Sequence, residues 1–204
     1  ANLLVKTHLS RKQDDYAKTI QMSSQSLLTI INDVLDFAKI EAGKLSLDNT
    51  PLNLKAAIED VLVMIAPEAH RKHIELIPQY YQDVPKHIIG DPLRIKQIVT
   101  NLVGNAIKFT KKGGVTISVS KSKNEQKLLF EIKDTGIGIS EENMGVIFDR
   151  FEQADITSTK KYQGTGLGLS ISYGIIKEMK GEITIQSKLN LFTEVKVVFP
   201  KFEE

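Results

Sequence analysis

The sequence predicts an α/β (α+β) sandwich, in which helices pack on one face of a mixed sheet, preceded by one long helix. Apolar residues recur at helical spacing over residues 10–42. From residue 45 onward, helical patterns alternate with short β-branched segments and turn residues, which is typical of a sheet covered by helices. The 204 residues are enough for one large domain with a smaller appendage.

The first segment is predicted to be a single amphipathic helix that needs a partner. Its N-cap is expected at Ser10 and its C-terminal stop at Gly43. The apolar stripe consists of Tyr16, Ile20, Leu27, Ile31, Val34, Leu35 and Ala38. Because one helix cannot bury such a stripe, residues 1–6 are expected to be the end of a partner helix. We divide the chain into residues 1–44, a truncated helical hairpin, and residues 45–204, a second domain, and expect it to be excised from a longer protein.

Capping residues mark the helix starts of the second domain. Asn53 and Asp91 are the expected N-caps of two long helices, and the proline after Asp91 favours a first helical turn. Ser140 is expected to cap a short helix. The predicted helices cover about residues 53–72, a segment from 91 that ends before Gly113, a few residues after 140, and 167–180, with Gly181 as the end.

The segments between these helices predict a mixed sheet. Strands are expected at residues 45–47, 74–77, 87–89, 115–119, 128–133, 182–187 and 194–199. Pro51 is expected to close the first strand, and Asn124 to lie in the turn of a hairpin between the fourth and fifth. Residues 152–163 are polar and lack a periodic pattern, which is typical of a mobile lid.

The composition excludes several classes of function. The net charge of +2 is too small to indicate a nucleic-acid partner. The absence of cysteine excludes disulfides, thiolate metal sites and thiol nucleophiles, and fits a reducing cytoplasm. No segment has the pattern of a signal peptide or of a membrane-spanning helix.

Three polar residues are expected on one face of the helix that Asp91 opens. Asn101, Asn105 and Lys108 are separated by four and then three residues, which places them on the same side. Amide oxygens suit Mg²⁺, which prefers hard oxygen ligands, and a lysine suits a phosphate. An ordinary polar helix face would have the same pattern, so these residues alone leave both interpretations open.

Asp134 follows an apolar strand and precedes two glycines. A carboxylate at a strand end can accept a hydrogen bond from the exocyclic amine of adenine, and Gly136 and Gly138 let the backbone approach the ring. An Asp-Thr-Gly turn without a function is equally compatible with these residues.

A second glycine motif opens an apolar helix. Free backbone N–H groups and the helix dipole make such a helix start an anion site. No lysine follows the glycines as in a P-loop, and no strand precedes them as in a Rossmann fold. The motif reads Gly164-Thr165-Gly166-Leu167-Gly168-Leu169.

Two pairs of residues lie between the glycine motifs. Phe148 and Phe151 are three residues apart and either pack in the core or shape a site. Lys160 and Lys161 lie in the polar segment, where they either reach a triphosphate or are solvated.

Together and in this order, these motifs resemble the N, G1, F and G2 boxes of the sensor histidine kinase ATP-binding domain. The resemblance covers essentially the whole chain and is to hybrid sensor kinases of the BarA and GacS kind. It implies a phosphotransferase that uses ATP and Mg²⁺ to phosphorylate a histidine, for relay to an aspartate of a response regulator or receiver domain. It also implies a homodimer through the helical hairpin, a cytoplasmic location, and membrane attachment only through parts outside this chain.

The resemblance also assigns roles to individual residues. Asn105 is implied as the chief Mg²⁺ ligand, Asp134 as the adenine contact and Phe109 as a wall of the pocket. The implied nucleotide-binding residues are Asn101, Asn105, Lys108, Phe109, Asp134, Gly136, Gly138, Ile139, Phe148, Phe151, Lys160, Gly164, Thr165, Gly166, Leu167, Gly168, Leu169 and Thr193. The chain departs from the family where Gln163 replaces a glycine before the G2 box, and where the turn before Thr193 lacks glycines.

The phosphoacceptor motif of the family is a histidine followed by an acidic residue, a hydrophobic residue, arginine, threonine or serine, and proline. None of His8, His70, His73 and His87 is followed by it. We therefore expect the acceptor to lie upstream of Ala1, and this chain to bind ATP without phosphorylating itself.

Two other interpretations remain at this point. ATPases of the same broad fold, such as gyrase, Hsp90 and mismatch-repair proteins, carry a glutamate where this chain has Asn101, and an amide cannot take a proton from water. A nucleotide-sensing module without turnover would also have these motifs.

Overall fold

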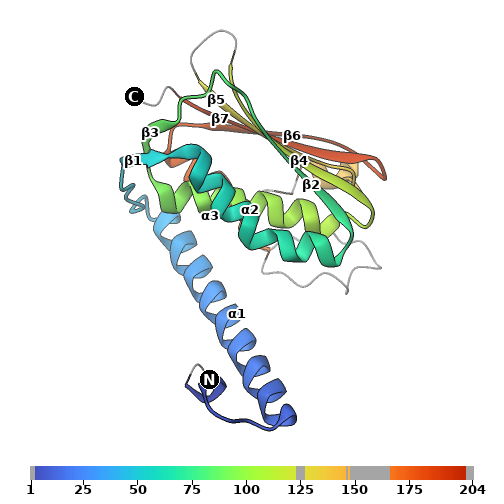
Figure 1. Cartoon of the computed structure of the whole chain (residues 1–204). Coiled ribbons are helices and arrows are strands. Elements are labelled where there is room, and N and C mark those ends of the chain that lie inside the picture. Colours follow the sequence, from blue (N-terminus) through green and yellow to red (C-terminus); the bar gives the residue numbers. More distant parts are fainter. Residues whose placement is uncertain (1–2, 123–126, 146, 148–165, 201–204) are drawn as a thin grey trace.

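In the computed structural model, one long helix projects from a sandwich of a sheet and helices (Figure 1). The structure describes residues 3–122, 127–145, 147 and 166–200. The long helix is α1 (Arg11–Glu41), preceded by a single 3-10 turn, η1 (Leu4–Lys6), where the end of a partner helix was expected. The predicted fold class, a mixed sheet with helices on one face after a long helix, is confirmed.

The sequence predicts both ends of α1 because its capping signals are local. Ser10 Oγ accepts from the backbone N–H of Gln13 at 3.4 Å, and Gln13 Oε1 accepts from the backbone N–H of Ser10 at 2.9 Å. At the other end, Gly43 has a φ of +61°, the left-handed conformation that terminates many helices. The predicted stripe from Tyr16 to Leu35 is exposed, so no described residue covers it.

Five strands form the main sheet. They are β2 (Ile74–Tyr80), β4 (Gly113–Lys121), β5 (Leu128–Asp134), β6 (Glu182–Lys188) and β7 (Phe192–Phe199), in the order β2-β4-β5-β7-β6. The sheet is mixed, since β2 runs parallel to β4 and every other neighbouring pair is antiparallel. The predicted hairpin of β4 and β5 is present, and its turn at Asn124 lies outside the described residues.

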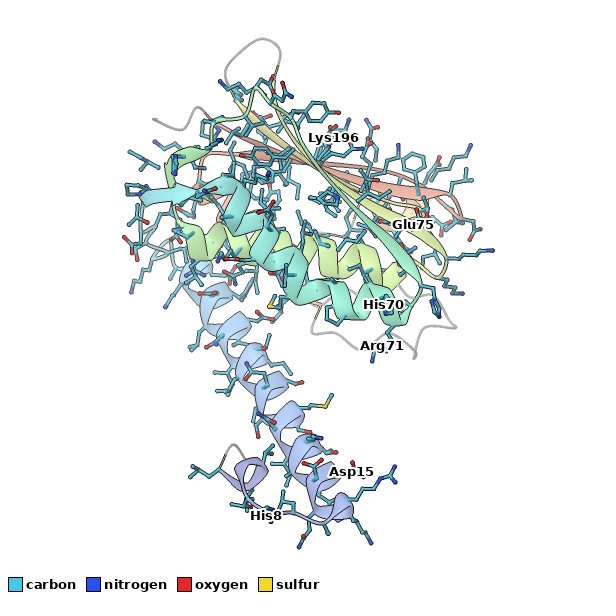
Figure 2. The ribbon with its side chains drawn as sticks, in the orientation of Figure 1. His8, Asp15, His70, Arg71, Glu75 and Lys196 are labelled. Carbon is cyan, nitrogen blue, oxygen red and sulfur yellow. The ribbon has the colours of Figure 1, made fainter. Side chains whose placement is uncertain are left out.

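Helices α2 (Leu54–Arg71) and α3 (Pro92–Phe109) cover one face of this sheet (Figure 1). Helix α5 (Gly168–Glu178) packs against α3, β6 and α1, and the short helix α4 (Glu141–Met144) follows Ser140. The predicted caps at Asn53 and Asp91 are confirmed, since both accept from the backbone N–H groups three residues on at 3.0 Å, whereas Ser140 is at the N-cap position of α4 without a side-chain capping hydrogen bond. The opposite face is polar, and Figure 2 shows Lys196 on it, where its ammonium lies 2.9 Å from Glu131.

The strand predicted at residues 45–47 is wrong. The strand in this region is β1 (Thr50–Asn53), which pairs antiparallel with β3 (His87–Gly90), so Pro51 lies inside a strand instead of closing one. A proline is tolerated there because β1 pairs with β3 alone and the other edge of the strand needs no N–H. Leu45 is buried in the core, which explains its apolar character without a ladder.

The end of α5 also differs in detail from the prediction. The helix was expected to run to residue 180 and stop at Gly181, but it ends at Glu178, and Lys180 has the left-handed conformation with a φ of +57°. Gly181 donates its N–H to Ile176 O at 2.8 Å, and a Cβ there would lie 2.8 Å from Val198 O. The glycine is therefore required by close packing on β7.

Within the described part of the chain, no helix combines the length and the apolar character needed to cross a membrane.

Candidate nucleotide-binding site

Helix α3 carries the predicted polar face. Asn101, Asn105 and Lys108 are each half-buried, whereas their neighbours Leu102, Val103, Ala106 and Ile107 are buried in the core. The amphipathic pattern of the helix therefore turns the two amides and the ammonium away from the sheet.

Asn101 connects the polar face of α3 to the start of α5. Its Nδ2 donates to Gly168 O at 3.2 Å and to Ser172 Oγ at 3.3 Å. The first and last of the predicted motifs, which are far apart in the sequence, therefore meet at this contact. Asn105, one turn further along α3, makes no side-chain hydrogen bond to any residue that the structure describes.

Lys108 lies at the C-terminal end of α3, with its Nζ 4.9 Å from the centroid of the Phe109 ring. Burial lowers the pKa of Lys108, and the positive charge of Lys72 lowers it further. Lys72 donates to Ile107 O at 2.9 Å and to Lys108 O at 3.1 Å. Sequence reasoning missed Lys72, because nothing in its own helix signals a contact with the end of α3.

Asp134 is the last residue of β5 and is buried, with 6% of its surface exposed. Burial raises the pKa of its carboxyl to about 6, against the opposing effect of backbone hydrogen bonds from Gly136 and Thr193. The Gly136 N–H donates to Asp134 Oδ1 at 2.8 Å, which fixes the carboxylate at the strand end.

The loop after Asp134 is held between α3 and the β6–β7 turn. The Ile137 N–H donates to Phe109 O at 3.2 Å, and Ile137 O accepts from Asn190 N at 2.6 Å. A Cβ on Gly136 would lie 2.7 Å from Phe109 O, and Gly138 has a φ of +66° and faces the carbonyl of Lys188. Both glycines are required where the sequence placed them.

Ser187 of β6 fixes the far side of this loop. Its Oγ accepts from Ile139 N at 2.8 Å and donates to Phe192 O at 2.7 Å. It also lies 3.1 Å from Thr193 Oγ1, and because its one proton goes to Phe192 O, the Thr193 hydroxyl donates to it. Thr193 thus lies near the loop, and its proton is already engaged. Ser187 was predicted only as a strand residue.

The described part of the second glycine motif leads directly into α5. Gly166 has a φ of +71°, Leu167 is buried, Gly168 begins the helix and Leu169 packs against the core. The remaining predicted residues, Phe148, Phe151, Lys160, Gly164 and Thr165, lie outside the described residues, as does the lid predicted at residues 152–163.

Three of the four predicted motifs, then, meet around α3. This arrangement of motifs, on the helix-covered face of a mixed sheet, is typical of an ATP-binding domain. A family model described as "Histidine kinase-, DNA gyrase B-, and HSP90-like ATPase" matches residues 90–203, and one described as "His Kinase A (phospho-acceptor) domain" matches residues 1–43. The chain belongs to the histidine kinase-, DNA gyrase B- and HSP90-like ATPase family, and its second match places it with the histidine kinases of that family.

Named relatives agree with this assignment. The chain is 47% identical over 189 residues to the sensor histidine kinase GacS of Pseudomonas protegens. This match covers 91% of the chain and 21% of that protein. It is 46% identical over 191 residues to the signal transduction histidine-protein kinase BarA of Escherichia coli. This match covers 92% of the chain and 21% of that protein. The chain spans about a fifth of the length of these relatives.

A solved structure is similar over nearly the whole chain. Full-length ShkA in complex with AMPPNP superposes with a TM-score of 0.81 and 32% identity, over 98% of this chain and 41% of that one. The sequence-based prediction that this is the ATP-binding catalytic portion of a histidine kinase is confirmed.

Proposed function

We propose that this chain binds ATP with Mg²⁺ beside α3 and serves a kinase that transfers the γ-phosphoryl group of ATP to a histidine. The observation that carries this proposal is the convergence of three motifs on α3. Asn101 contacts the start of α5 at Gly168, and Phe109 O accepts from the loop that follows Asp134. The residues proposed to contact adenine and those proposed to contact the phosphates therefore lie beside the same helix.

Asp134 is proposed to accept a hydrogen bond from the exocyclic amine of adenine. Its carboxylate accepts backbone hydrogen bonds from Gly136, at Oδ1, and from Thr193, and a carboxylate has further acceptor lone pairs for a ligand. A buried carboxylate gives a stronger hydrogen bond than an exposed one, because little water competes for it. Gly136 and Gly138 hold the loop close enough to the core for this contact.

The phosphates and Mg²⁺ are proposed to lie along the polar face of α3 that Asn101, Asn105 and Lys108 form. The donor set fits such an ion, since amide oxygens are hard ligands and Mg²⁺ usually completes its shell with waters and phosphate oxygens. The described residues contain no cluster of three or more histidine or acidic side chains, so the nucleotide itself would supply most of the anionic ligands. When bound, the ion neutralises phosphate charge. Lys108 would contribute a compact positive charge next to it.

Kinase action is favoured over ATP hydrolysis by the residue at position 101. An amide cannot remove a proton from water, and Nδ2 of Asn101 donates to Gly168 O and Ser172 Oγ of α5. A position that would activate water in an ATPase is therefore inert here, which leaves the nucleotide for an external acceptor. A sensing module without turnover is the remaining alternative.

Partners and domain division are part of the same proposal. Residues 1–44 would form half of a helical hairpin that dimerises through the exposed stripe of α1, and residues 45–204 the ATP-binding domain. Support for this boundary comes from the end of α1 at Glu41 and from Leu45, which is buried in the core of the sandwich. We propose that the receiver of the phosphoryl group is an aspartate of a response regulator or receiver domain, that the location is cytoplasmic, and that any membrane attachment lies outside this chain.

Calorimetry with ADP and Mg²⁺ tests the adenine contact. Asp134→Asn should weaken binding by about ten-fold or more, because the amide loses the charge-assisted hydrogen bond. The control is Asp60→Asn, an exposed carboxylate paired with Lys96 on the surface. Equal ADP affinity of Asp134→Asn and the unaltered chain would refute the adenine assignment.

Incubation with radiolabelled ATP tests the kinase assignment. The chain alone should bind ATP but show neither labelling nor fast phosphate release, and a chain extended upstream should form acid-labile phosphohistidine. Figure 2 shows His8 before α1 and His70 at the end of α2, so these two histidines lie far apart. Labelling of either one would show that the acceptor was misplaced, and rapid phosphate release without labelling would favour an ATPase.

A further inference from the structure

Ser172 is a fully buried serine in the second turn of α5. Its exposed fraction is 0%, and its Oγ donates to Gly168 O at 2.9 Å. The same oxygen lies 3.3 Å from Asn101 Nδ2 on α3. A buried hydroxyl with one partner on its own helix and another on a neighbouring helix joins the two elements at this point.

The partners of Asn101 determine which way its amide faces. Gly168 O only accepts, so the Asn101 atom that lies 3.2 Å from it must carry hydrogen. Ser172 gives its single proton to Gly168 O, so its oxygen can only accept from Asn101. A flipped amide would place Oδ1 against the carbonyl oxygen of Gly168 and lose the hydrogen bond to it. The amide orientation is therefore fixed by chemistry.

This orientation leaves Oδ1 as the acceptor that Asn101 offers to a ligand. Nδ2 of Asn101 donates to two acceptors of α5, and Oδ1 accepts no hydrogen bond from the described residues. An amide oxygen cannot bond to a phosphate oxygen, since both are acceptors. It can bind a divalent cation or a water molecule on that cation.

We propose that Ser172 is a positioning residue that makes Asn101 selective for the magnesium complex of a nucleotide over the free nucleotide. The inference rests on the proposed function, in which Asn101 lies at the phosphate end of the site. Ser172 acts through Asn101: without its hydroxyl, Nδ2 keeps only Gly168 O as a partner in α5, and the amide is held less tightly. Lys108 would bind the anionic side of the same ligand, so the loss affects recognition of the cation alone.

The test compares ADP affinity with Mg²⁺ and with EDTA, by calorimetry. In Ser172→Ala the gain in affinity from Mg²⁺ should fall about five-fold, the effect of one neutral hydrogen bond, while affinity in EDTA stays within two-fold. Ser170→Ala is the matched control, because Ser170 Oγ donates to Leu167 O at 2.9 Å in the same helix. Ser172→Cys keeps a side chain of similar size with a weak acceptor, so the gain in ADP affinity from Mg²⁺ should fall by less than in Ser172→Ala. This variant replaces Ser172→Ala in the test if the alanine variant folds poorly.

A second readout needs no nucleotide. The Asn101 side-chain NH₂ signals should exchange slowly with solvent in the unaltered chain and in Ser170→Ala, and several-fold faster in Ser172→Ala. Unchanged exchange in Ser172→Ala, or an unchanged gain from Mg²⁺ in a chain that binds ADP, would overturn the inference. Failure of the unaltered chain to bind ADP at all would instead overturn the proposed function.

Discussion

The contact between α1 and the sandwich predicts a large effect of one substitution. Arg94 of α3 is 8% exposed, and its Nη1 lies 2.7 Å from Asp36 Oδ2 on α1. Gln97 joins the pair, because its Nε2 donates to the same Asp36 oxygen at 2.9 Å and its Oε1 accepts from Arg94 at 2.7 Å. Burial alone would raise the pKa of Asp36, but the hydrogen bonds from Arg94 and Gln97 hold it below its ordinary value.

Asp36→Ala leaves the Arg94 guanidinium buried without a carboxylate. Removing one partner of a buried ion pair typically costs about 3–5 kcal/mol. The side chains of Arg94 and Asp36 are 10% and 15% exposed, so some water can enter, and we expect a loss near the lower end, about 3 kcal/mol. Arg94 Nε is already a buried nitrogen without a partner among the described residues, so the guanidinium has little compensation left.

Urea unfolding followed by circular dichroism measures this loss, with a surface pair as the control. Asp60 and Lys96 are separated by the same 2.7 Å, but their side chains are 67% and 40% exposed. Asp60→Ala should therefore cost less than about 1 kcal/mol. The double variant Asp36→Ala with Arg94→Met should be more stable than Asp36→Ala alone, because it removes the orphaned charge. Equal losses in Asp36→Ala and Asp60→Ala would refute the reasoning from burial.

Three further predictions follow from the site. Gly138→Ala should destabilise the fold by more than about 1 kcal/mol, because the φ of Gly138 is +66°. In α3, a Cβ on Gly104 would meet nothing within 4 Å, so Gly104→Ala should stabilise the fold by up to about 1 kcal/mol. Urea unfolding measures both effects. Lys72→Met should raise the pKa of Lys108, measurable by NMR titration, because a neighbouring positive charge is removed. Burial raises the pKa of the Asp134 carboxyl to about 6, so its contribution to the free energy of unfolding, up to about 3 kcal/mol, should be fully present below pH 3.8. That contribution should be lost as the pH rises through 6. Asp134→Asn should lack this part of the pH dependence, and parallel stability profiles would contradict it.

Helix starts could be predicted from the sequence because their signals are local. Ser10 with Gln13, Asn53 with Ala56, and the Asp91 cap each depend on atoms three residues apart. The strand β1 could not be predicted in the same way. Its ladder pairs Thr50 with Gly90, and the preference of proline against strands indicated a boundary instead.

The same distinction applies to the site. Its motifs were identified from short spacings, and the structure brings Asn101, Asp134 and the start of α5 around one helix. The residues that hold these motifs were missed, because their hydrogen bonds join distant parts of the chain. Ser172 is 71 residues from Asn101, and Ser187 is 48 residues from Ile139. Serines and lysines are common on helices and strands, so no local signal separates these from the others.

Two residues of the proposed site, Asp134 and Lys108, carry charges that the fold alone does not favour. Burial raises the pKa of Asp134 and lowers the pKa of Lys108, so the protein environment disfavours the charged form of both groups. Asp36 differs, because Arg94 and Gln97 within the fold stabilise its charge. In the function that we propose, a nucleotide would offset this cost, since its exocyclic amine donates to a carboxylate and its phosphates attract an ammonium. Part of the free energy that burial costs at Asp134 and Lys108 would then be recovered on ligand binding, which is the physical reason that we place the site here.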